Sequence, residues 1–179
     1  VALPTIASNL GVAASQGTWV ITAYITANAI SVPLTGFLAG RFGQVRLFLI
    51  SILLFTIASF LCGISPTLPT IITARTLQGV AAGPMVTLSL SILFYVYPPE
   101  KRTVAMSIWS MVIVVAPIFG PLLGGYITDN FHWGWIFFIN IPIGVLALFL
   151  CRRGLKGVET STSKAPVDRV GLGLMILTA

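Results

Sequence analysis

Long stretches without charged side chains constrain the fold of this chain more than any other feature. No Asp, Glu, Lys or Arg occurs at residues 1–40, 47–74, 76–99, 103–128 and 130–151. Each stretch reaches the ~20 residues that a helix needs to cross the hydrocarbon core of a bilayer. Only 8% of the 179 residues are charged, whereas a soluble domain of this size must cover its surface with polar side chains. The chain is therefore predicted to be an all-α membrane protein.

Turn residues and charges divide the chain into five full spans, preceded by the end of one helix and followed by the start of another. The spans are expected at about 17–38, 45–62, 68–94, 104–127 and 134–151, after a helix tail at 1–7. We expect residues 1–151 to form a transmembrane bundle, residues 152–169 a cytoplasmic linker, and residues 170–179 the start of the next transmembrane helix. Because the chain begins without Met inside one apolar stretch and stops inside another, we interpret it as a fragment of a longer protein.

The connections between spans carry Lys and Arg in strict alternation. Successive connections hold 0, 2, 0, 2, 0 and 5 basic residues, so nine of the ten lie on one side. Short cytoplasmic loops retain positive charge, which predicts that 39–46, 95–103 and 152–169 are cytoplasmic. Aromatic anchors favour the headgroup level, and those at the predicted outer ends are Trp19, Tyr126, Trp133 and Trp135.

Arg75 is the one charged residue inside a predicted span. A guanidinium near mid-bilayer costs about 2.5–3.5 kcal/mol on insertion scales, so such residues usually face a cavity or a partner. The alternative is that Arg75 extends to the outer surface, about 10 Å of helix away. Gln78 lies on the same helical face, and Gly79 and Gly83 follow at a spacing that lets a second backbone approach. This face is a candidate functional site.

Two amide side chains at membrane depth are candidates for a transport cavity. Asn28 lies in the first full span, and Asn140 lies beside Pro142 in the last one. Hydroxyl groups in spans most often form hydrogen bonds between helices. The two asparagines are therefore the better cavity candidates.

The span at 104–127 contains a run rich in proline and glycine. Each proline removes an intrahelical hydrogen bond and bends the helix, while glycines strip one face of side chains. The pattern predicts either tight static packing or an element that moves, and both interpretations stay open on the residues alone. The residues concerned are Pro117, Gly120, Pro121, Gly124 and Gly125.

The connection after the first full span combines glycines with arginines. Gly36 and Gly43 permit a tight turn, while Arg41 and Arg46 can hold helix ends or anionic lipid. Simple anchoring of positive charge at the cytoplasmic side would explain the arginines equally well.

Several function classes are disfavoured by what the sequence lacks. All four carboxylates fall in loops or at span ends, so the spans hold no proton carrier. The phosphate-binding glycine loop of ATP-driven pumps is absent, and His132, the one histidine, lies in an outer loop, where it cannot build a metal site or supply a catalytic base. The basic residues lie in loops, which argues against nucleic-acid binding. No cofactor is expected, and a membrane-embedded enzyme is the less favoured alternative.

These segments resemble motifs of the major facilitator superfamily and, within it, of the EmrB-like drug:proton antiporters. Residues 36–46 look like the cytoplasmic gating motif, with Gly40 at the position that is usually acidic. Arg75-Thr76-Leu77-Gln78-Gly79 is similar to the helix-four motif, and residues 116–125 resemble the antiporter motif of helix five. Residues 1–6 and 133–142 resemble the close of the helix-one motif and the helix-six signature.

The resemblance implies the N-terminal six-helix bundle of a fourteen-helix transporter, truncated in helix one and ending in helix seven. It implies proton-coupled export of lipophilic drugs or toxic compounds by alternating access, in a bacterial inner membrane and without enzymatic activity. Arg75 and Gln78 would couple protonation to the cavity, residues 36–46 would gate it, and residues 116–125 would form a flexible seal. The resemblance also implies a periplasmic adaptor and an outer-membrane channel as partners. A transporter of one specific small solute is the alternative.

Overall fold

The computed structural model describes residues 3–158, which form helices and no strand within that range. The helices are α1 (Leu3–Asn9), α2 (Ala14–Gly17), α3 (Trp19–Phe42), α4 (Gln44–Gly63), α5 (Leu68–Val96), α6 (Pro99–Asn130), α7 (Trp135–Phe138) and α8 (Asn140–Gly154). Five segments are long and apolar enough to cross a membrane: Ala14–Phe42, Gln44–Gly63, Leu68–Val96, Pro99–Asn130 and Trp135–Gly154. The five predicted spans and the all-helical membrane fold are confirmed. The predictions for most of the linker and for 170–179 lie outside the described residues.

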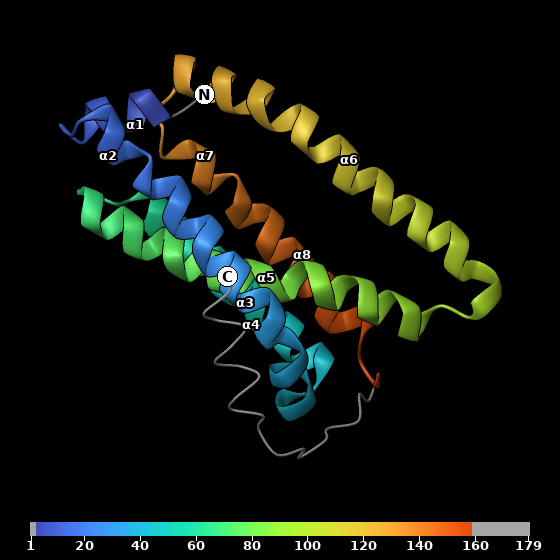
Figure 1. The fold of residues 1–179 in the computed structure, drawn as a ribbon. Coiled ribbons are helices and arrows are strands. Elements are labelled where there is room, and N and C mark those ends of the chain that lie inside the picture. The colour runs from blue at the N-terminus through green and yellow to red at the C-terminus, as the bar shows by residue number, and fades with distance from the viewer. Residues whose placement is uncertain (1–2, 159–179) are drawn as a thin grey trace.

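Helices α3, α4, α5 and α8 form the packed part of the molecule. α5 lies between α3 and α4, and α4 contacts α8 on its other side. α6 runs apart from these helices and approaches them mainly near its two ends (Figure 1). Within α6 only Ala105 is buried. The described part of the chain is therefore a bundle with one largely unpartnered helix beside it.

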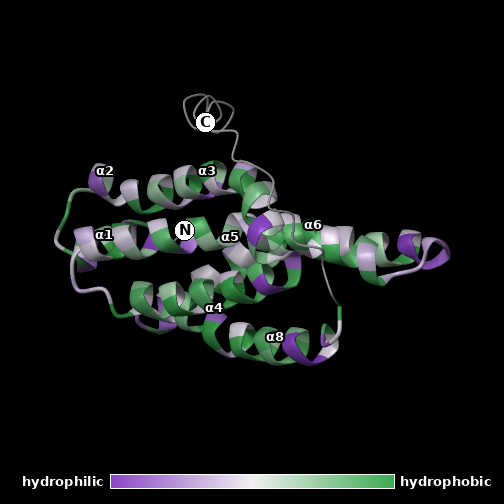
Figure 2. Ribbon diagram, turned by 90° about the horizontal axis from the view of Figure 1, so that it is seen from below, coloured by the Kyte–Doolittle hydropathy of each residue, from purple (hydrophilic) through white to green (hydrophobic). Residues whose placement is uncertain are grey.

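The basic connections meet at one end of the bundle. The end of α3 and the start of α4 join α5 in a buried cluster of Ala39, Leu47, Leu88 and Ile92, against which Leu155 packs just after α8. Figure 2 shows hydrophobic colour along the helices and hydrophilic colour at the start of α6 and the end of α8. The described basic residues of the connections thus share one end, as their alternation along the sequence predicts.

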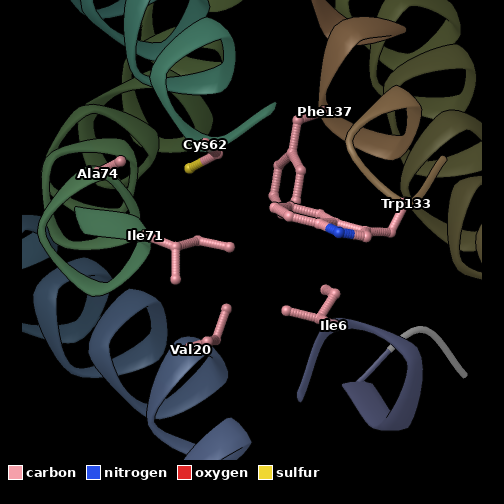
Figure 3. Close-up of a cluster of buried hydrophobic side chains, with 7 residues drawn as sticks. All are labelled: Ile6, Val20, Cys62, Ile71, Ala74, Trp133 and Phe137. Carbon is pink, nitrogen blue, oxygen red and sulfur yellow. The ribbon is translucent and has the colours of Figure 1, made fainter. Parts of the chain in front are cut away.

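The opposite end is closed by a second apolar cluster (Figure 3). Its buried side chains are Ile6, Val20, Cys62, Ile71, Ala74, Trp133 and Phe137. Trp133 lies at this end, as predicted, but its expected role as an anchor in the headgroup layer is wrong, because the residue is only 3% exposed and its ring packs edge-on against Phe137 at 6.2 Å. Trp19, Tyr126 and Trp135 are exposed, as anchors must be.

α3 and α4 are joined by a single residue, Gly43. The helices extend to Phe42 and resume at Gln44, so the connection is shorter than the predicted 39–46. Gly43 has φ 84° and ψ 142°, a combination close to the region that only glycine occupies without strain. The tight turn predicted from the glycines is therefore made by Gly43, whereas Gly36 lies within α3.

Replacing Gly43 by alanine should destabilise the protein. A side chain held in this backbone region costs about 1–3 kcal/mol, so the thermal unfolding midpoint of the purified protein should fall. Gly36→Ala is the matched control, because a Cβ on Gly36 meets no atom within 4 Å. Equal unfolding midpoints for the two variants would contradict this account of the joint.

Candidate functional site

The side chain of Arg75 is held inside the bundle. Its Nε donates a hydrogen bond to the Val20 carbonyl at 3.2 Å. Its guanidinium carbon lies 4.1 Å from the centre of the Tyr24 ring and 5.7 Å from that of Phe137. The alternative that Arg75 extends to the outer surface is therefore wrong, because its guanidinium is held by Val20 and Tyr24 of α3 and by Phe137 of α7.

Gln78 continues the polar contacts of Arg75 toward α4. Arg75 Nη1 donates to Gln78 Oε1 at 2.6 Å, and Gln78 Nε2 donates to Ser59 Oγ at 2.6 Å. The Cys62 thiol lies 3.8 Å from the same Gln78 oxygen. Gln78 is 1% exposed and Ser59 is fully buried, so both the oxygen and the nitrogen of the Gln78 amide need the partners they have. We call Tyr24, Ser59, Arg75, Gln78 and Phe137 the Arg75 cluster.

The positive charge of the Arg75 cluster is met by dipoles and aromatic faces. Neither hydrogen bond of Arg75 goes to a carboxylate. In the described part of the chain the acids Glu100 and Asp129 lie in the first and last turns of α6. An aromatic face attracts a desolvated cation by about 2 kcal/mol, and a guanidinium does not lose its proton in a protein. Arg75 therefore supplies a permanent positive charge that acts electrostatically on groups near it.

Gly79 and Gly83 bring α5 into backbone contact with α3. A Cβ on Gly79 would collide with the Tyr24 carbonyl oxygen and would lie 2.9 Å from the Ala27 Cβ. A Cβ on Gly83 would collide with Ser31 Oγ. Ser31 Oγ donates to the Gly79 carbonyl at 3.4 Å, across the two helices. The predicted close approach at these glycines is confirmed, and it sets the position of Tyr24 relative to Arg75.

The two predicted cavity asparagines lie outside this network. Asn28 is partly buried on α3 and Asn140 is the first residue of α8. Within residues 3–158, Arg75 bonds to Val20 and Gln78, and Gln78 also bonds to Ser59. Neither asparagine side chain takes part in these bonds. The structure therefore joins Arg75 to Gln78 and leaves Asn28 and Asn140 outside their hydrogen-bond network.

The two predicted moving elements lie away from the Arg75 cluster. Arg41 and Arg46 are exposed on either side of Gly43, at the basic end of the bundle. The proline- and glycine-rich run lies within α6, which is one helix through Pro117 and Pro121. A Cβ on Gly120 or Gly124 meets no atom within 4 Å, so among the described residues these two glycines have no packing partner.

Three members of the Arg75 cluster were not identified from the sequence as site residues. Ser59 is one of three hydroxyl residues in a mainly apolar span, with Ser51 and Thr56, which is a weak signal for an interhelical bond. Tyr24 contributes its ring and Phe137 is an apolar residue in an aromatic run. No sequence signal marks these two rings as neighbours of a cation.

Comparison with known proteins gives consistent matches along almost the whole chain. The model of the Major Facilitator Superfamily matches residues 1–175. The chain is 56% identical over 177 residues to the multidrug export protein EmrB of Escherichia coli K12, which covers 99% of this chain and 35% of that protein. It is 55% identical over 177 residues to the fatty acid resistance protein FarB of Neisseria gonorrhoeae, again covering 99% and 35%. The chain therefore spans about a third of the length of these relatives.

A solved structure shares the fold. The crystal structure of the peptide transporter POT (E310Q mutant) in complex with alafosfalin superposes with a TM-score of 0.75 at 20% sequence identity. The superposition covers 94% of this chain and 37% of the peptide transporter. At this identity the likeness concerns the arrangement of the helices alone.

Proposed function

Because the chain belongs to the Major Facilitator Superfamily, we propose that it forms part of an exporter that expels lipophilic compounds in exchange for protons. The transporter acts by alternating access in the cytoplasmic membrane of a bacterium and has no enzymatic activity. The names of its relatives, multidrug export and fatty acid resistance proteins, support export of lipophilic substrates. A periplasmic adaptor and an outer-membrane channel complete the export path.

The observation that carries this proposal is the Arg75 cluster. A charge inside a membrane span is costly and is retained where it serves a function. Arg75 is fixed by Val20 and Gln78, so its field has a defined position. A protonatable group brought near this field binds its proton less tightly. Movement of such a group toward or away from Arg75 thereby couples proton release to a change of conformation.

The remaining predicted site residues have roles in this cycle. Asn28 and Asn140 line the substrate cavity, and residues Gly36 to Arg46 gate its cytoplasmic side. The proline- and glycine-rich face of α6 forms the flexible seal, which is consistent with the absence of a packing partner for Gly120 and Gly124 among the described residues. A seal that opens and closes needs such a smooth surface, because backbones can then approach closely without interlocking side chains.

A transport assay on the full-length protein tests the proposed function. Inside-out vesicles are prepared from producing cells with an acidic buffer in the lumen. Accumulation of a lipophilic dye is then measured by its fluorescence. We expect accumulation that stops when nigericin collapses the pH gradient, and release of lumenal protons when dye is added. Dye accumulation that is unaffected by nigericin would contradict proton coupling.

Gly124→Leu should slow transport and leave the protein folded. The Cβ of residue 124 has open space within the described part of the chain, so a leucine disturbs only the face of α6 that must meet another helix during the cycle. Overpacking a close contact costs about 1–3 kcal/mol, which predicts roughly a tenfold lower transport rate. Gly124→Ala is the matched control and should keep most of the activity.

The amount of variant protein in the membrane is measured alongside the rate. Normal transport by Gly124→Leu would favour static packing of this face, the interpretation that the residues alone leave open.

A further inference from the structure

An apolar groove opens at the basic end of the bundle, between α4, α5 and α8. Its volume is about 360 Å³, within the ~300–1,000 Å³ typical of small-molecule sites. We call it the inner groove. Its lining residues are Phe48 on α4, Ser89, Ile92, Leu93, Val96 and Tyr97 on and after α5, and Leu150, Cys151, Gly154 and Leu155 on and after α8.

Guanidinium groups border the inner groove on two walls. Beside the α5 wall, Arg102 donates from Nε to the carbonyl of Tyr97 at 3.1 Å, and its guanidinium carbon lies 5.8 Å from the Phe94 ring centre. In the α8 wall, Arg152 and Arg153 directly follow Cys151, and the Arg153 guanidinium lies 5.9 Å from the Phe149 ring centre. Arg102 is therefore bound to Tyr97, a residue of the groove lining, while Arg152 and Arg153 lie next to the lining residues Cys151 and Gly154 along α8.

The charges at this end of the molecule are unbalanced. Among residues 3–158 the connections here carry seven basic side chains, at positions 41, 46, 101, 102, 152, 153 and 156, and one acid, Glu100. The cytoplasmic leaflet carries acidic lipid, and each basic residue near its surface contributes to binding it. Guanidinium groups bind phosphate oxygens in pairs of hydrogen bonds.

We propose that the inner groove binds an acidic phospholipid of the cytoplasmic leaflet. One acyl chain lies along Phe48, Ile92 and Leu150, and the phosphate is held by Arg102. Arg152 and Arg153 add positive charge beside the α8 wall of the groove. Basic pockets between helices on the cytoplasmic side are the places where anionic headgroups bind. The site is separate from the Arg75 cluster and does not depend on the proposed transport activity.

The headgroup part of the site is tested by native mass spectrometry of the full-length protein released from nanodiscs. Phosphatidylglycerol is compared with phosphatidylcholine of identical acyl chains. We expect phosphatidylglycerol to be retained preferentially, and the preference to fall about fivefold for each guanidinium removed in Arg102→Gln and in Arg153→Gln. Arg41→Gln removes an exposed charge at the same end, away from the groove, and should leave the preference unchanged.

The acyl-chain part is tested by filling the groove. A Cβ on Gly154 meets no atom within 4 Å, so Gly154→Leu places a side chain in the groove without a clash. This variant should lose the retained phosphatidylglycerol, whereas Val145→Phe, which adds volume to an exposed position of α8, should keep it. Both variants are first checked for an unchanged size-exclusion profile.

Cys151 provides a second readout of the same site. It lines the groove and is partly exposed, whereas Cys62 is fully buried. Modification of Cys151 by N-ethylmaleimide, followed by peptide mapping, should slow severalfold in phosphatidylglycerol and not in phosphatidylcholine. The proposal would be overturned by equal retention of the two lipids or by equal retention of phosphatidylglycerol in Gly154→Leu and the parent. It would also be overturned if labelling of Cys151 did not depend on the lipid.

Discussion

Replacing Arg75 by alanine should abolish proton-coupled export by the full-length protein. The variant removes the one charge of the Arg75 cluster and the hydrogen bonds that Arg75 donates to Val20 O and Gln78 Oε1. Hydrogen bonds to a charged group contribute about 1.5–3 kcal/mol each, so loss of the two predicts a transport rate lower by roughly a hundredfold or more. The measurement is dye accumulation driven by a pH gradient, normalised to the amount of folded protein.

Two further variants separate charge from geometry and from folding. Arg75→Lys keeps a positive charge but cannot donate to Val20 and Gln78 from one planar group, so its rate should lie between those of the parent and the alanine variant. Thr73→Ala changes an exposed residue of the same helix, whose hydroxyl bonds only to its own helix at Pro69 O. It should transport normally. Export at the parental rate by Arg75→Ala would refute the coupling role.

Gly79→Leu should prevent the bundle from folding. At this position a side chain meets the Tyr24 carbonyl oxygen and the Ala27 Cβ. Moving α3 aside would open its contact with α5, including the hydrogen bond from Ser31 Oγ to the Gly79 carbonyl. Overpacking of an ordinary core costs about 1–3 kcal/mol, and a collision with backbone costs more, against a total stability of about 5–15 kcal/mol. We expect loss of the monodisperse peak in fluorescence-detected size-exclusion chromatography.

Val80→Leu is the matched control for this prediction. It adds a methylene group at the next position of α5, on an exposed face, and should give a normal peak. A monodisperse Gly79→Leu protein would mean that the contact between α3 and α5 adjusts, and that the position of Tyr24 over Arg75 does not depend on Gly79.

The close contact between α3 and α5 was predictable from the sequence in part: the sequence indicated that a helix approaches α5 closely, but not which helix. The spacing of Gly79 and Gly83 predicted a close helix approach, and the structure has it, because small residues let the backbones of two membrane helices come close enough to pack. The sequence did not indicate that α3 is the partner, or that Tyr24 is thereby placed over the guanidinium. Partner choice depends on the complementary surfaces of two helices that are separated along the chain.

Trp133 shows why the aromatic prediction failed in one case and held in others. A tryptophan near a span end is compatible with the headgroup level and with a buried contact, since its ring is both large and polar at one atom. Trp19 and Trp135 are exposed at the span ends, whereas Trp133 lies among Ile6, Val20 and Ile71. Burial was decided by neighbours that no local pattern identifies.

The sequence by itself determined the spans, their alternating orientation, the glycine joint and the location of the one intramembrane charge. Each of these depends on a single helix, because in lipid a helix satisfies its own backbone hydrogen bonds and inserts according to its own composition. Only the tertiary structure decided what surrounds that charge. Val20, Tyr24, Ser59 and Phe137 come from α3, α4 and α7, and their meeting at Arg75 and Gln78 follows from how those helices pack.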